Sequence, residues 1–317
     1  MIVAWGEAMI GERLAHRLFH PPRRAHHRGP ADFGLTASET TIRTTDGTAL
    51  HVWMIPGTGV GTAVVGHGIG LTKSASLRQA ALLHGRGYHV VLFDHRNHGM
   101  SDADPFRSGL ADRFGSDIDA CIALATRTWP GDEPLVLWGF SFSTFPTLHS
   151  LRHRHPRVAG ALFDSGPGLD LDAMLRHFLT GGGISVPRTL RKVLRRRGVV
   201  DAFAKSAVRM LGTGWPPPEA PAADSPPMLF LIGTEDAVID PAQISAIASH
   251  YPTSSTVELP TGHLQGVKAA PEQYGAAVLA FLDGLDPAKA RGGAAPPGRA
   301  RTGQTTQRAP RPRSSGT

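Results

Sequence analysis

The sequence predicts an α/β protein with a mostly parallel sheet. From about residue 39 onward, short apolar runs alternate with segments of helical periodicity. Runs that are apolar throughout are typical of strands buried on both faces, as in parallel sheets. With 317 residues, of which 41% are hydrophobic and 19% charged, the chain has the size and composition of one large globular domain. This composition excludes wholesale disorder, collagen-like repeats and a multi-span membrane protein.

An antiparallel hairpin is predicted to open the sheet. Residues 40–45 and 48–56 are extended, and the Asp46-Gly47 dipeptide between them favours a tight turn. Further strands are predicted at 62–66, 89–93, 135–138, 158–163, 228–232 and 256–259. The predicted helices lie near 75–84 and 116–128, from residue 142 onward, and near 271–285.

Between residues 166 and 226 the alternation stops in a stretch rich in Pro, Gly and Arg. Helical spacing predicts helices near 169–179 and 190–211, so we expect a small cap over the sheet. The chain therefore divides into an amphipathic helix and linker at 1–38, the α/β domain with its cap insertion at 39–286, and a basic tail at 287–317. The tail lacks apolar periodicity, and we expect it to be disordered.

The first 20 residues have apolar positions at helical spacing, interrupted by charged residues. This pattern predicts an amphipathic helix and neither a signal peptide nor a membrane span. We expect the helix to dock on the body of the protein, and the protein to be cytoplasmic. Peripheral contact with a membrane, helped by Arg17, Arg23 and Arg24, is the alternative.

The formal net charge of +7 resides in the tail, because residues 287–317 carry seven Lys and Arg side chains and no acidic one. A neutral body with a basic tail is not the charge distribution of a nucleic-acid enzyme, so no nucleic-acid partner is expected. Cys121 is the only cysteine, which excludes an intrachain disulfide framework and a cysteine-rich metal site. Its place on an amphipathic helical segment predicts a core position.

The sharpest chemical signal is the segment Gly139-Phe140-Ser141-Phe142-Ser143, which directly follows the apolar strand at 135–138. Small residues two positions on either side of Ser141 allow a tight strand-to-helix turn that exposes the hydroxyl. The start of the helix also places backbone N–H groups beside an oxyanion formed there. Ser143 departs from the common G-x-S-x-G pattern, but serine is small enough to fit.

A serine hydroxyl becomes a strong nucleophile only with a base and with an acid that orients the base. His263 follows the strand at 256–259, and Asp236 follows the strand at 228–232, both at the carboxyl edge of the sheet. The chain order Ser141, Asp236, His263 is that of enzymes with this nucleophile turn. The rival candidates for the acid are Glu235, Asp240 and Asp164.

An oxyanion hole needs two N–H donors, and Phe142 supplies the first candidate. The loop from Gly66 to Gly70 follows the strand at 62–66, and its glycines let the backbone approach a reacting carbonyl closely. The N–H of Ile69 is therefore the second candidate. We expect the side chain of His67 to shape this loop by packing and hydrogen bonding.

Several landmarks, taken in chain order, resemble those of the α/β-hydrolase superfamily. They are His67-Gly68-Ile69-Gly70, the stretch from Asp94 to Ser101, the turn at Ser141, Asp236 and His263. The resemblance covers about residues 40–285, apart from the cap. It implies a mostly parallel eight-stranded sheet flanked by helices, with no cofactor and no metal. The 94–101 stretch and the short cap are similar to those of serine hydrolases of the esterase, thioesterase and aminopeptidase type.

The predicted function is hydrolysis of a carboxylic ester or thioester through an acyl-enzyme intermediate, with Ser141, Asp236 and His263 as the triad. Apolar cap residues suggest a small-molecule substrate with a hydrophobic acyl group; they are Leu169, Met174, Phe178 and Leu179. Amide or peptide hydrolysis, and ligand binding without catalysis, are the alternatives on the same fold. The oligomeric state stays open.

Dinucleotide binding is a further class to weigh, because the glycines of the 66–70 loop and Asp94 imitate its fingerprint. Leu71 occupies the position of the required third glycine, which disfavours this class.

A basic face in the cap is predicted to be solvated, with docking of an anionic substrate group or lipid headgroup as the alternative. This face comprises Arg188, Arg191, Lys192, Arg195, Arg196 and Arg197. Carboxylates or thiolates at ligand spacing are lacking beside the histidine groups, so no metal site is expected at His16, His20, His26 and His27, or at His153 and His155.

Overall fold

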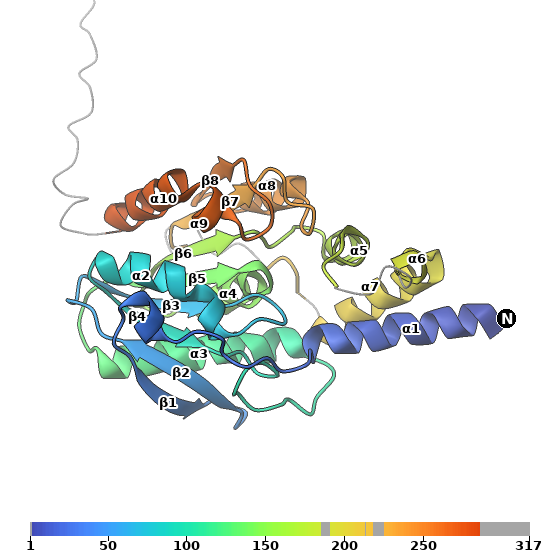
Figure 1. The fold of residues 1–317 in the computed structure, drawn as a ribbon, viewed down its shortest axis with the longest axis horizontal. Helices are drawn as coiled ribbons and strands as arrows, with labels where there is room; N and C mark the ends of the chain where they lie inside the picture. The colour runs from blue at the N-terminus through green and yellow to red at the C-terminus, as the bar shows by residue number, and fades with distance from the viewer. Residues whose placement is uncertain (1, 185–190, 213, 218–224, 286–317) are drawn as a thin grey trace, which may run out of the picture.

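The computed structural model describes residues 2–184, 191–212, 214–217 and 225–285. Its centre is an eight-stranded sheet of order β1-β2-β4-β3-β5-β6-β7-β8 (Figure 1). Strand β2 is antiparallel to β1 and β4, and all other neighbouring strands are parallel. The predicted fold class and opening hairpin are confirmed. The strands are β1 (Ser38–Arg43), β2 (Ala49–Ile55), β3 (Gly61–Gly66), β4 (Tyr88–Phe93), β5 (Leu135–Phe140), β6 (Val158–Asp164), β7 (Met228–Gly233) and β8 (Ser254–Leu259).

Helices cover both faces of the sheet. Alternate residues of β3 belong to different cores, with Val64 on one face and Ala63 and Val65 on the other. Because both faces are buried, the strands read as continuous apolar runs. One face packs against α2 (Leu77–Gly85) and α10 (Pro271–Gly284), and the opposite face against α3 (Leu110–Thr128), α4 (Thr144–Ser150) and α8 (Pro241–His250).

Helix α8 and the short α9 (Gly266–Ala269) are absent from the sequence prediction. The start of α8 nevertheless carries a recognisable signal. Asp240 caps the helix by accepting the N–H of Ala242, and Pro241 takes the first helical position. These helix-start residues could therefore have located α8, which apolar periodicity did not reveal.

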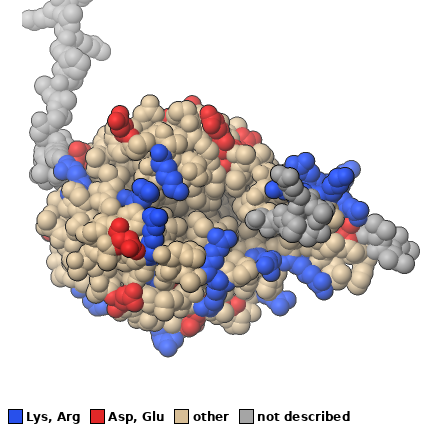
Figure 2. All heavy atoms as spheres, viewed as in Figure 1, with Lys and Arg blue, Asp and Glu red and all other residues tan. Residues whose placement is uncertain are grey.

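The cap contains α5 (Leu171–Gly181), α6 (Arg191–Leu194) and α7 (Arg197–Leu211). The single helix predicted at 190–211 is wrong, because Arg196 has an extended backbone conformation (φ −68°, ψ 132°) and separates α6 from α7. Residue Arg188 of the predicted basic face lies outside the described residues, as does the tail at 287–317. The other five members of the basic face are exposed. Figure 2 shows one face of the molecule, with Lys and Arg side chains beside a hollow near its centre.

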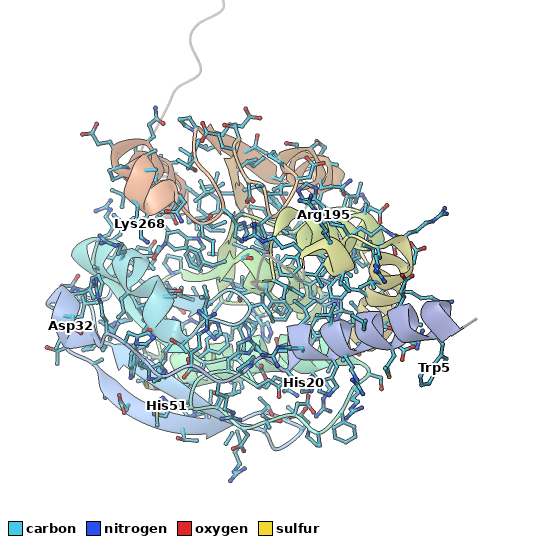
Figure 3. All side chains as sticks on the ribbon, turned by 45° about the vertical axis from the view of Figure 1, so that its right-hand side comes forward. Trp5, His20, Asp32, His51, Arg195 and Lys268 are labelled. Atoms are coloured by element: carbon cyan, nitrogen blue, oxygen red, sulfur yellow. The ribbon has the colours of Figure 1, made fainter. Side chains whose placement is uncertain are left out.

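Helix α1 (Ile2–Phe19) extends past the edge of the sheet and packs along α7 (Figure 1). At Gly11 a Cβ would lie 2.6 Å from the carbonyl oxygen of Val199, so only glycine permits this approach. The predicted helix thus docks on the cap. Near its free end Trp5 is 70% exposed (Figure 3). In the described ranges, no helix combines the length and apolar character needed to cross a bilayer.

Candidate active site

Ser141 stands at a strained turn between β5 and α4. Its φ of 48° lies in the left-handed region, which non-glycine residues rarely adopt, as expected of a nucleophile turn. At Gly139 a Cβ would lie 2.7 Å from the carbonyl oxygen of Ser143, so only glycine allows the chain to fold back this closely. The side chain of Ser141 borders an apolar cavity.

The structure explains why Ser143 can replace the usual glycine. The Ser143 side chain is buried, and its Oγ is hydrogen-bonded to His95 Nε2 at 2.9 Å. A Cβ at Gly66 would lie 1.9 Å from this Oγ, so the hydroxyl fits only because residue 66 has no side chain.

The three predicted triad residues form one hydrogen-bonded chain. His263 Nε2 lies 2.8 Å from Ser141 Oγ, and His263 Nδ1 lies 2.7 Å from Asp236 Oδ2. The second carboxylate oxygen, Oδ1, accepts the N–H groups of Val238 at 2.8 Å and Ile239 at 2.9 Å. Asp236 is buried and its carboxylate is held by backbone donors, so the imidazole faces a fixed acceptor.

The rival acids occupy other places. Glu235 is exposed, and Asp240 caps α8. Asp164 is buried, which raises the pKa of its carboxyl group, and it accepts the hydroxyl of Tyr274 at 2.7 Å. None of these three carboxylates is hydrogen-bonded to His263 in the described structure.

Asp164 nevertheless supports the histidine loop through Ser165. The hydroxyl of Ser165 donates to Asp164 Oδ1 at 2.8 Å and accepts the N–H of Leu264 at 3.1 Å. Leu264 directly follows His263 and has a left-handed φ of 55°. This relay therefore holds the backbone beside the imidazole, and sequence reasoning missed it because its contacts are long-range.

The loop after β3 and the turn after β5 border the same cavity. Ile69 and Phe142 both line the cavity that contains Ser141. The N–H of Gly70 donates to His98 Nε2 at 3.0 Å, which fixes the turn. His67 is buried, and burial lowers its pKa to about 3, so the ring is neutral. Its Nδ1 donates to the Gly68 carbonyl at 2.8 Å and its Nε2 accepts the His95 N–H at 3.1 Å, so this side chain shapes the loop.

The stretch from Asp94 to Ser101 has a structural role. Asp94 accepts Lys73 Nζ at 2.7 Å and the N–H of Met100 at 3.1 Å. Burial alone would raise the pKa of Asp94, but a hydrogen bond from His26 and the charge of Lys73 outweigh it and hold the pKa below its usual range. This network ties the loop after β4 to the linker after α1 and the turn before α2.

A narrow apolar cavity of about 60 Å³ adjoins Ser141. Of the cap residues predicted to contact an acyl group, Met174 and Phe178 line this cavity, whereas Leu169 and Leu179 do not. Helix α1 contributes Leu18 and Phe19 to the wall, and Ile69, Phe145, Leu175, Leu211 and Ile239 add further apolar surface. The contribution of α1 was not predicted, because helical periodicity shows which face is buried but not what it covers.

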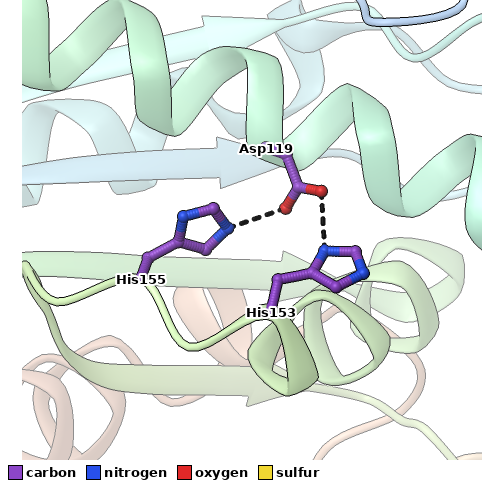
Figure 4. Close-up of side chains that lie close together, drawn as sticks. All are labelled: Asp119, His153 and His155. Carbon is purple, nitrogen blue, oxygen red and sulfur yellow. Dashed lines mark hydrogen bonds and ion pairs between the residues drawn. The ribbon is translucent and has the colours of Figure 1, made fainter.

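Asp119 of α3 lies between His153 and His155 (Figure 4). Its two carboxylate oxygens accept His153 Nδ1 at 2.7 Å and His155 Nε2 at 2.9 Å. The expectation that no carboxylate accompanies this histidine pair is therefore wrong. Among the described residues, Asp119, His153 and His155 are the one group of three His, Cys, Asp or Glu residues whose ligand atoms lie within 4.8 Å of one another. The carboxylate contacts one nitrogen of each ring. His153 and His155 precede β6, whose start lies at the edge of the sheet opposite Ser141.

Part of the chain is similar to known proteins in sequence. Residues 60–211 match the profile of the family described as serine aminopeptidase, S33. A polyketide transferase of Aspergillus fumigatus is 31% identical over 131 residues, which are 40% of this chain and 44% of that protein. The uncharacterized protein YfhR of Salmonella typhimurium is 30% identical over 141 residues, 43% of this chain and 46% of that protein. The chain spans less than half the length of these relatives.

Solved structures are similar over most of the chain. An esterase of Pyrococcus furiosus superposes with a TM-score of 0.67 at 20% identity, covering 84% of this chain and 97% of that one. An esterase of Thermogutta terrifontis has a TM-score of 0.58 at 20% identity, covering 79% and 100%. The sheet order and these likenesses define the α/β-hydrolase fold. This fold is the one that the landmarks in the sequence predicted.

Proposed function

We propose that this protein is a serine hydrolase that cleaves a carboxylic ester or thioester of a hydrophobic acid. The observation that carries the proposal is the hydrogen-bonded chain Asp236–His263–Ser141, which ends at an apolar cavity. Esterases are also among the proteins with a similar fold.

In the first half-reaction, His263 Nε2 takes the proton of Ser141 Oγ as that oxygen attacks the acyl carbonyl. Asp236 keeps the imidazole oriented and stabilises its positive charge. The N–H groups of Ile69 and Phe142 hold the oxyanion, and the imidazolium gives its proton to the departing oxygen or sulfur. Water then attacks the acyl-enzyme with His263 as base, and the acid and the free Ser141 hydroxyl are released.

The lining of the cavity favours an acyl group over a free amino terminus. In the described structure its walls carry no acidic side chain, and an aminopeptidase substrate would bring an ammonium group that needs one. A space of about 60 Å³ holds about four to six water-sized groups. We therefore expect short and medium acyl chains, with amide hydrolysis the less favoured alternative.

A fluorophosphonate probe tests the activated serine. We expect adduct formation at Ser141, located by peptide mass spectrometry, and no adduct in Ser141→Ala. Nitrophenyl esters from two to twelve carbons then report the acyl site, and kcat/KM should rise to about four to six carbons and fall beyond. A folded protein that neither reacts with the probe nor cleaves any ester would support a non-catalytic binder instead.

A further inference from the structure

A second, wider space lies on the other side of His263. This groove, of about 530 Å³, is bordered by Gly68, Phe140 and His263 and by residues of α2 and α9. The apolar cavity is bordered by Ser141 but not by His263, and the groove by His263 but not by Ser141. The two spaces therefore meet at the hydrogen bond between these two residues.

Three cationic side chains border the groove. Arg28 comes from the linker after α1, Arg78 from α2, and Lys268 from α9 (Figure 3 labels Lys268). All three are exposed. No Asp or Glu of the described chain borders the groove or forms an ion pair with these three side chains.

The buried cations Lys73 and Arg96, in contrast, are neutralised by carboxylates. Lys73 pairs with Asp94 at 2.7 Å, and Arg96 pairs with Asp104 at 2.9 Å. In the groove the positive charge is instead left open to a concave surface. A concave site lined by charges of one sign concentrates their electrostatic field, which favours the binding of an anion there.

The chemistry decides which part of a substrate occupies each space. His263 delivers its proton to the leaving group, so the leaving group must lie beside His263. The acyl chain must lie beside Ser141 and the oxyanion donors, where the walls are apolar. The groove therefore receives the leaving alcohol or thiol, and it is the larger of the two spaces.

We propose that the groove binds a leaving group that carries phosphate. The inference rests on the proposed ester or thioester hydrolysis and extends it to the substrate class. Phosphate suits this site because Arg and Lys side chains donate charge-assisted hydrogen bonds to its oxygens. Two sources share this chemistry, a nucleotide-bearing thiol such as coenzyme A and the headgroup of a lysophospholipid.

Matched substrates separate the phosphate from the rest of the molecule. Butyryl-coenzyme A and S-butyryl-pantetheine share the acyl group, the thioester and the pantetheine arm, and only the first carries phosphate, together with adenosine. S-butyryl-4′-phosphopantetheine, which adds phosphate without adenosine, should behave like the coenzyme A thioester. We expect kcat/KM to be about tenfold higher for the coenzyme A thioester at low salt, and the ratio to fall as salt screens the charges. A butyryl lysophospholipid, compared with monobutyrin, tests the headgroup source in the same way.

The variant Arg78→Gln/Lys268→Gln removes two groove charges. We expect it to lower kcat/KM for the phosphate-bearing substrate about tenfold and to leave that for its neutral partner unchanged. The control is Arg127→Gln/Arg209→Gln, which removes the same charge from exposed positions on α3 and α7 and should change neither. Equal rates for both members of both substrate pairs, or an equal loss on both in the groove variant, would overturn the inference while leaving the hydrolase proposal intact. If folded wild-type protein cleaves none of these substrates but reacts with the fluorophosphonate probe, the inference alone is overturned. If it also fails to react with the probe and to cleave the nitrophenyl esters, the hydrolase proposal itself is overturned.

Discussion

The hydroxyl of Ser143 fills the space that the missing side chain of Gly66 leaves. A Cβ at residue 66 would stand 1.9 Å from Ser143 Oγ, and the hydroxyl lies 2.9 Å from His95 Nε2. The turn at Ser141 and the end of β3 are thereby packed against each other. The atypical serine in the turn after β5 is therefore matched by a glycine at the end of β3.

A double-mutant cycle measures this complementarity. Gly66→Ala should destabilise the fold by about 1–3 kcal/mol through overpacking. Ser143→Gly should cost about 1–2 kcal/mol, because it removes the hydrogen bond to His95 and adds glycine flexibility. Urea denaturation of the double variant should show a smaller loss than the sum of the single losses. Strict additivity would contradict direct packing of the two residues.

Asp236→Asn tests the orienting acid. An amide in this position no longer favours the imidazole tautomer that can accept the serine proton, so kcat should fall by about four orders of magnitude. Asp240→Asn serves as the control, because asparagine also caps a helix well and should leave kcat unchanged. Steady-state kinetics on one ester compares the variants, and comparable losses in both would place the acid elsewhere.

Ser165→Ala tests the relay that holds the histidine loop. Without the hydroxyl, the N–H of Leu264 loses its acceptor, so His263 should be less well positioned. We expect kcat to fall about tenfold with KM little changed, since alanine at this position keeps the cavity wall apolar. Ser249→Ala, which removes an exposed hydroxyl from α8, is the matched control. A rise in KM alone would contradict a positioning role.

Acid should destabilise the fold through its buried histidines. Burial lowers the pKa of His67 and His95 to about 3 and that of His98 well below its usual value. Between the unfolded pKa of about 6.5 and a folded value of about 3, the unfolded chain binds more protons than the folded one. The free energy of unfolding should therefore decrease as pH falls through this window, by up to about 1.4 kcal/mol per pH unit for each histidine. Urea titrations at pH 7.5 and pH 5 measure this, and equal stability at both would contradict neutral buried rings.

Gly11→Leu tests whether α1 belongs to the acyl cavity. A side chain at this position would meet the backbone of α7 and push the helices apart, which should move Leu18 and Phe19 away from the cavity. We expect kcat/KM for butyryl esters to fall and the chain-length optimum to shift to longer esters. Gly6→Leu, on the same helix where a Cβ would have no neighbour within 4 Å, should leave the profile unchanged.

The class of fold and the positions of Ser141, Asp236 and His263 could be read from local signals. Buried parallel strands are apolar along their whole length, and the side chains that follow them meet at one edge of the sheet. The start of α8 was signalled by Asp240 and Pro241, but such helix-start residues carry less weight than apolar periodicity. The break between α6 and α7 at Arg196 has no comparable signal, because arginine is compatible with a continuous helix.

The sequence by itself determined the sheet, the turn at Ser141 and the order of the polar residues at its edge, since these follow from periodicity and chain order. Only the tertiary structure decided that α1 lies on α7, that Asp119 reaches His153 and His155, and that Arg28, Arg78 and Lys268 border one groove. Each of these is a contact between segments far apart in the chain. Such contacts depend on how whole elements pack, and the local pattern of any single segment does not contain that information.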